Sequence, residues 1–156
     1  NQACLSQWWD APFKADSKQY PTAEHYMMAQ KARLFGDEDA YAKTLLAKKP
    51  AEVKEIGRTV RNFEPGIWDA NKYRIVVEGN YHKFNADKAI RDYLLATKQR
   101  VLVEASPVDK IWGIGLAADD ERVHNPSAWQ GENLLGYALM EVRDLLLKEQ
   151  AGLQNN

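Results

Sequence analysis

The stretch of sequence that decides the fold reads Tyr20-Pro-Thr-Ala-Glu-His-Tyr-Met-Met-Ala-Gln-Lys-Ala-Arg-Leu-Phe-Gly36. Thr22 is a favourable N-cap residue and Gly36 supplies a natural end, so the sequence predicts a helix between them. A helix places Glu24 and Lys31 on one stripe, roughly 10 Å apart along its axis. That separation is too long for a tight ion pair but suits two groups that share a bound ligand. The alternative is an ordinary amphipathic helix with charged ends.

The segments on either side of this helix predict further helices and little β structure. Residues 9–20 carry turn residues and alternating apolar positions, which predict a short hairpin or an extended lead-in. Further helices are expected over residues 37–48, 51–60, 68–83, 87–96 and 133–148. The apolar stripe of the last helix is expected on Leu134, Ala138, Val142 and Leu145.

A small β component is expected in the second half of the chain. The best strand candidate is 101–104, and residues 109–115 are expected to extend again. Residues 119–131 are polar and predict a surface loop. The expected fold class is therefore α+β, predominantly helical, with one compact domain over residues 1–156.

Composition limits the classes of function. The chain has 156 residues with 21 basic and 22 acidic side chains, so a net charge of −1 creates no global field for nucleic acid or an anionic membrane. No apolar run approaches the roughly 20 residues that cross a bilayer, so no membrane partner is expected. Cys4 is the only cysteine, which leaves the cytoplasm as the default location. The chain starts without methionine, so residues before Asn1 could be missing, and the sequence does not fix the oligomeric state.

The common catalytic motifs are missing from the sequence. His25, His82 and His124 lie far apart, so no metal site is expected, because zinc or iron needs several converging ligands. Serine and cysteine nucleophile motifs and glycine-rich phosphate loops are also absent, and no cofactor is expected. Carboxylates and lysines remain as the candidate catalytic groups.

A second notable segment reads Asp109-Lys-Ile-Trp-Gly-Ile-Gly115. It places a carboxylate three residues before Trp112, and its glycines would let the backbone approach a ligand closely. Trp112 fits either a core aromatic residue or a ring-stacking pocket. Phosphate binding would fall to basic side chains such as Arg58 or Lys83, whose alternative role is to cover a solvated helix face.

Several segments along the chain match the pattern of one known family. They are 20–31, Gly57-Arg58, Lys83-Phe84, Leu95-Ala-Thr97, Leu102-Val-Glu104, Asp109-Lys-Ile-Trp-Gly113 and 133–143. Together they resemble the NADAR or YbiA-like family, over about residues 5–147. Gln7 departs from the pattern, because many members carry asparagine there, and the family's usual upstream segment is missing or cut short.

The resemblance implies cleavage of an N-glycosidic bond. One branch of the family hydrolyses phosphorylated ribosylamino-pyrimidine intermediates of riboflavin synthesis, which makes a small phosphorylated ribosyl-nucleobase the expected substrate. Another branch removes ADP-ribose from guanine bases in nucleic acid, and nucleic acid is a partner only under that alternative. A further alternative is a non-catalytic module that binds ADP-ribose or a nucleotide. The near-neutral charge favours the small metabolite.

Bond cleavage at the ribose C1′ suggests roles for the candidate residues. Lys31 is the predicted nucleophile, through a Schiff base, or a charge stabiliser. The Schiff base needs a neutral amine, for which desolvation by Met27, Met28 and Leu34 is expected. Glu24 is the predicted acid/base, and Asp109 a second acid/base or an anchor for a ribose hydroxyl. The predicted substrate-binding residues are Trp112, Gly113, Trp68, Arg58, Lys83 and Asn133, with the tryptophans stacking on the base and Arg58 or Lys83 near phosphate.

Overall fold

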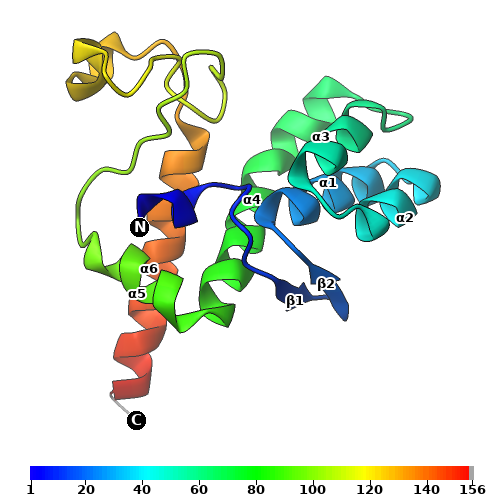
Figure 1. Ribbon diagram of the computed structural model, residues 1–156, viewed down its shortest axis with the longest axis horizontal. Coiled ribbons are helices and arrows are strands. Elements are labelled where there is room, and N and C mark those ends of the chain that lie inside the picture. Colours follow the sequence, from blue (N-terminus) through cyan, green and yellow to red (C-terminus); the bar gives the residue numbers. More distant parts are fainter. Residues whose placement is uncertain (155–156) are drawn as a thin grey trace. The chain divides into compact units, whose positions relative to one another are not determined.

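The computed structural model describes residues 1–154, which fall into two compact units. Unit 1 is Asn1–Ala96, and unit 2 runs from Thr97 onward. Unit 1 holds the 3₁₀ turn η1 (Gln2–Leu5), a hairpin and five helices, whereas unit 2 holds long irregular segments and one long helix (Figure 1). The predicted α+β class with mostly helical content is confirmed. None of the helices in the described part of the chain has the length and apolar character of a membrane-spanning segment.

The hairpin at the start of unit 1 pairs β1 (Phe13–Ala15) with β2 (Lys18–Tyr20) in antiparallel fashion, with Phe13 opposite Tyr20. Asp16 and Ser17 connect the strands with positive φ angles of 51° and 64°. Such a two-residue turn has the twist that a tight hairpin needs. The predicted hairpin is therefore confirmed.

Helix α1 (Ala23–Leu34) is the central element of unit 1. The Thr22 hydroxyl caps it by accepting a bond from the His25 N–H (3.2 Å), and Gly36 adopts a φ of +70° after its end. Helices α2 (Glu38–Leu46), α3 (Pro50–Arg58) and α4 (Pro65–Ala86) all pack against α1. Eight of its residues are consequently buried, Glu24 among them. The predicted helix is confirmed, but α1 is a buried helix and not an amphipathic surface helix.

Helix α4 is longer than predicted, because it begins at Pro65 and continues to Ala86. Proline suits the first helical position, where its missing N–H costs no hydrogen bond. Gly79 lets α4 approach α1 closely, since an added Cβ would lie 2.6 Å from the Tyr26 ring. Helix α5 (Lys88–Ala96) follows as predicted.

The structure corrects the predicted strand at 101–104 in unit 2. The Glu104 N–H donates to the side-chain oxygen of Asn133 (2.9 Å), and the Asn133 amide donates to the Leu102 carbonyl (3.0 Å). The Glu104 carbonyl accepts from the Ile114 N–H (3.0 Å). A side chain and a turn thus take the bonds that a neighbouring strand would make. Residues 109–115 also form turns rather than an extended segment.

The rest of unit 2 is a polar loop followed by helix α6 (Leu134–Gln154). The loop contains the short 3₁₀ turns η2 (Glu121–His124) and η3 (Pro126–Ala128). The predicted helix is confirmed but its buried stripe is shifted, because Leu145 is exposed and Leu134 only half-buried. The buried residues of the stripe are Leu135, Ala138, Leu139, Val142 and Leu146. Both stripes fit helical periodicity, and packing selects one of them.

Candidate functional site

Lys31 lies between two aromatic rings in unit 1. Its Nζ is 4.6 Å from the centre of the Phe63 ring and 5.3 Å from that of the Trp68 ring. Phe63 belongs to the turn before α4, and Trp68 to the first turn of α4. The structure thus brings together two predicted site residues, Lys31 and Trp68. Phe63 was not among the predicted site residues, because nothing in the local sequence pattern distinguishes it from an ordinary turn residue.

Two influences act on the pKa of the Lys31 amine. Burial lowers this pKa, because the charged form loses hydration, and the Glu24 carboxylate acts in the opposite direction. Burial is the larger influence. The partial desolvation predicted for Lys31 is therefore present. The share of Met27, Met28 and Leu34 in it stays a prediction. A lower pKa increases the neutral fraction of the amine, which is the nucleophilic form.

Glu24 lies in the first turn of α1 and is 8% exposed. A carboxylate at this position is stabilised by the helix dipole. The Glu24 N–H donates to the Gln7 carbonyl (3.0 Å), and the Gln7 side-chain oxygen accepts from the Asn80 amide (2.7 Å). Gln7, where the sequence departs from the family pattern, therefore connects the N-terminal segment to α1 and α4.

His25 is buried next to Glu24 and holds the start of α1 in place. Its Nε2 lies 3.0 Å from the Ala47 carbonyl, and its Nδ1 lies 2.7 Å from the Thr22 hydroxyl. A carbonyl can only accept, so Nε2 carries the proton and Nδ1 accepts from Thr22. Burial lowers the pKa of His25 and favours this neutral form.

Lys83, a predicted phosphate-binding residue, makes a buried contact within unit 1, and its phosphate role stays a prediction. Its side chain is fully buried in unit 1, and its Nζ donates to the Ser6 carbonyl (2.8 Å). Burial lowers the pKa of Lys83 to about 8. Arg58 is exposed and paired with Glu55 (2.5 Å), so a phosphate contact through Arg58 stays a prediction.

Asp109 and Gly113 organise a tight turn in unit 2. The Asp109 carboxylate accepts from the N–H groups of Ile111 (3.0 Å) and Trp112 (2.9 Å). A Cβ added to Gly113 would lie 2.9 Å from the carbonyl oxygens of both Asp109 and Glu104. Glycine is therefore required at this position by the chain's own packing, and the binding role of Gly113 stays a prediction. Trp112 is half-buried and remains a predicted stacking residue.

Asn133 supports the structure of unit 2. It is fully buried with a φ of +54°, and its oxygen and nitrogen bond to the backbone of Glu104 and Leu102. Its substrate-binding role stays a prediction.

Glu104 is an acidic residue that the predicted site residues did not include. Burial, and to a smaller extent Asp109, raise the pKa of its carboxyl group. The signal that could have found it is its place in the segment Leu102-Val-Glu104, which carries the family resemblance. Among residues 1–154, no three or more His, Cys, Asp and Glu side chains converge as metal ligands would.

Comparisons with known proteins assign the chain to a family. The NADAR domain model matches residues 1–147, across both units. A protein named N-glycosidase from Acanthamoeba polyphaga mimivirus is 45% identical over 145 residues, which cover 90% of this chain and 85% of that protein. The NMR structure of the Escherichia coli protein YbiA has a TM-score of 0.80 at 30% identity, over 97% of this chain and 82% of that chain.

A plant protein also matches. The chloroplastic riboflavin biosynthesis protein PYRR of Zea mays is 33% identical over 137 residues, which are 82% of this chain and 20% of that protein. The family match covers the helix with Glu24 and Lys31 as well as the turn with Asp109 and Trp112. The chain therefore belongs to the NADAR family.

Proposed function

We propose that this protein is an N-glycosidase that hydrolyses the C1′–N bond of phosphorylated ribosylamino-pyrimidine intermediates of riboflavin biosynthesis. The relatives from mimivirus and Escherichia coli are named N-glycosidases, and the maize relative is named for riboflavin biosynthesis. The observation that carries the proposal is the Lys31 amine, half-buried against two aromatic rings, with Glu24 on the same helix. This arrangement supports a neutral amine on the same helix as a proton-transfer group.

The first half of the proposed reaction forms a Schiff base. Glu24, as a carboxylic acid, gives a proton to the ribose ring oxygen while the nitrogen lone pair opens the ring to an iminium ion at C1′. The neutral Lys31 amine adds to C1′, and a proton passes from Nζ to the pyrimidine nitrogen. The aminopyrimidine leaves with the electron pair of the C1′–N bond, and Nζ and C1′ remain joined as a Schiff base.

The second half of the proposed reaction is hydrolysis. Water adds to C1′ while Glu24, now a carboxylate, accepts a proton. Collapse of the adduct frees the Lys31 amine and releases ribose 5-phosphate. We assign Asp109 as a second acid/base or an anchor for a ribose hydroxyl. Trp68 and Trp112 are assigned to stack on the nucleobase, and Arg58 to contact the phosphate.

Trapping with borohydride tests the proposal directly. The protein incubated with substrate and borohydride is expected to carry a pentosyl phosphate adduct on Lys31, detected by peptide mass spectrometry. Lys31→Ala should lose the adduct and nearly all turnover, because no other amine has this position. Lys88→Ala is the matched control, since Lys88 is exposed and its amine pairs with Asp92 on its own helix. Near wild-type turnover in Lys31→Ala would refute the Schiff-base route.

The identity of the released sugar distinguishes the substrate classes. Release of ribose 5-phosphate from the pyrimidine intermediate supports the proposal, whereas release of ADP-ribose from ADP-ribosylated guanine supports the alternative branch of the family. Binding of either compound without turnover, with Glu24 and Lys31 replaceable at no loss of affinity, would show a non-catalytic module.

A further inference from the structure

Phe63 is the solvent-facing member of the two aromatic residues around Lys31. Its side chain is 42% exposed, whereas Trp68 is 9% exposed. The Phe63 ring is also the nearer of the two to the Lys31 amine. The amine therefore lies near one buried ring and one exposed ring.

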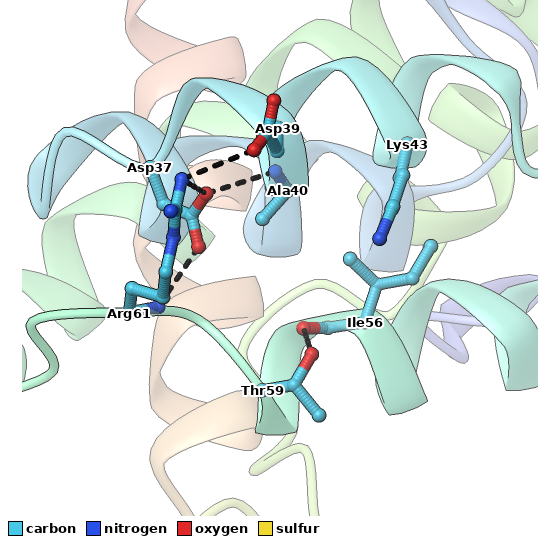
Figure 2. A pocket seen from close by; sticks show the side chains of 7 residues that line it. All are labelled: Asp37, Asp39, Ala40, Lys43, Ile56, Thr59 and Arg61. Carbon is cyan, nitrogen blue, oxygen red and sulfur yellow. Dashed lines mark hydrogen bonds and ion pairs between the residues drawn. The ribbon is translucent and has the colours of Figure 1, made fainter.

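The segment that carries Phe63 is fixed by a clamp between Asp37 and Arg61. The buried Asp37 carboxylate accepts from the Arg61 N–H (2.8 Å), the Arg61 guanidinium (3.1 Å) and the Ala40 N–H (3.0 Å), as Figure 2 shows. Asp39 accepts a further bond from the guanidinium (3.3 Å). The clamp thus joins the first turn of α2 to the residues just before Phe63.

Two further features direct the Phe63 ring toward Lys31. Asn62 adopts a φ of 63°, which turns the chain sharply between the clamp and Phe63. The Phe35 ring, just after α1, packs edge-on against the Phe63 ring with centroids 5.4 Å apart. Phe63 is therefore held from the α2 side by the clamp and from the α1 side by an aromatic contact.

We propose that Phe63 is a positioning residue that shields the Lys31 amine from water, held in place by the Asp37–Arg61 clamp. The importance of this shielding for turnover rests on the proposed role of Lys31 as nucleophile. The ring has two opposing effects: its π face stabilises the ammonium, and its bulk removes hydration from it. We expect the loss of hydration to outweigh the π contact, so that removal of the ring raises the pKa of the amine, which burial lowers in the intact protein.

The pKa of Lys31 can be measured without any assumption about activity. Competitive labelling of the free protein with acetic anhydride, followed by peptide mass spectrometry, gives the pH midpoint at which Lys31 becomes reactive. Phe63→Ala is expected to move this midpoint to higher pH, and Phe63→Tyr to keep it near wild type. Ile67→Ala is the matched control, because Ile67 is also 42% exposed.

The direction of the change decides between the two effects of the ring. An unchanged or lower midpoint in Phe63→Ala would overturn the proposal, since it would mean that the ring mainly stabilises the charge. Phe63→Leu provides a second variant, which keeps apolar bulk without the π face that stabilises the ammonium, so its midpoint should lie below that of Phe63→Ala. Far-UV circular dichroism checks that each variant is folded.

Turnover gives a separate readout. The rising limb of kcat against pH should move upward in Phe63→Ala together with the labelling midpoint. Below the pKa, an increase of about one in that pKa lowers the neutral fraction of the amine about tenfold. If Phe63→Ala moves the labelling midpoint but neither wild type nor any variant turns over the substrate, only the proposed function is contradicted. Turnover with an unmoved midpoint would contradict the role of Phe63 alone.

Discussion

The pKa and the accessibility of two lysines in unit 1 depend on the residues packed around them. Lys31 and Lys83 are both lysines with lowered pKa values, and burial is the main cause in each. The Lys83 amine donates to the Ser6 carbonyl in a fully buried position, whereas the half-buried Lys31 lies beside an exposed ring. Accessibility, and not the pKa alone, therefore separates the structural lysine from the proposed nucleophile.

Replacement of Glu24 tests the proposed proton transfer at the residue scale. Glu24→Gln should lower kcat by about 10² or more, because the amide cannot exchange the proton. The loss of the negative charge should also move the rising limb of the pH profile to lower pH, since Glu24 raises the pKa of Lys31. Steady-state kinetics across pH measure both effects. An unchanged rate would limit Glu24 to stabilising the first turn of α1.

Helix α1 shows how local signals and packing act together at the scale of an element. Its N-cap, its end at Gly36 and its length follow from the sequence between Tyr20 and Gly36. His25 then ties the start of the helix to the connection after α2, through the Ala47 carbonyl. The start of α1 is therefore held by an imidazole that burial favours in its neutral form.

The protonation of His25 predicts a loss of stability in mild acid. Burial puts the pKa of His25 in the folded state below its unfolded value, so the unfolded state binds more protons below pH of about 6.5. The stability contributed by the neutral ring is complete above that pH and is lost as the pH falls toward the folded pKa. His25 can change the free energy of unfolding by at most about 1.4 kcal/mol per pH unit.

Denaturant unfolding between pH 7 and pH 5 measures this effect. His25→Gln should be less stable at pH 7, since it loses the contacts to Thr22 and Ala47, but its stability should vary less with pH. Equal pH slopes for wild type and variant would show that other groups cause the acid dependence.

The charge of the whole molecule bears on the choice of substrate. The net charge of −1 gives no excess of basic groups for a polyanion. If the substrate is a small phosphate ester held by one ionic contact, raising the salt from about 50 to 200 mM should lower kcat/KM by no more than about fourfold. Several phosphate contacts to a nucleic acid would lower it by about 10³ or more. The salt dependence of kcat/KM, measured at constant pH, therefore distinguishes a small phosphate ester from a nucleic acid as the substrate.

Elements that depend on near neighbours in the chain were predictable from the sequence. The hairpin turn at Asp16-Ser17, the cap at Thr22 and most helix positions follow from local turn, capping and periodicity rules. Errors arose where the partner of a group is distant in the sequence. The predicted strand at 101–104 was wrong because Asn133, about thirty residues away, takes its hydrogen bonds.

The candidate site divides in the same way. The sequence by itself determined that Glu24 and Lys31 share a helix and that the chain carries the pattern of the NADAR family, because both depend on spacing and residue type. Only the tertiary structure decided that Phe63 and Trp68 surround the Lys31 amine and that Lys83 is buried. The physical reason is that burial and ring contacts depend on which helices pack together, and local periodicity does not specify that choice.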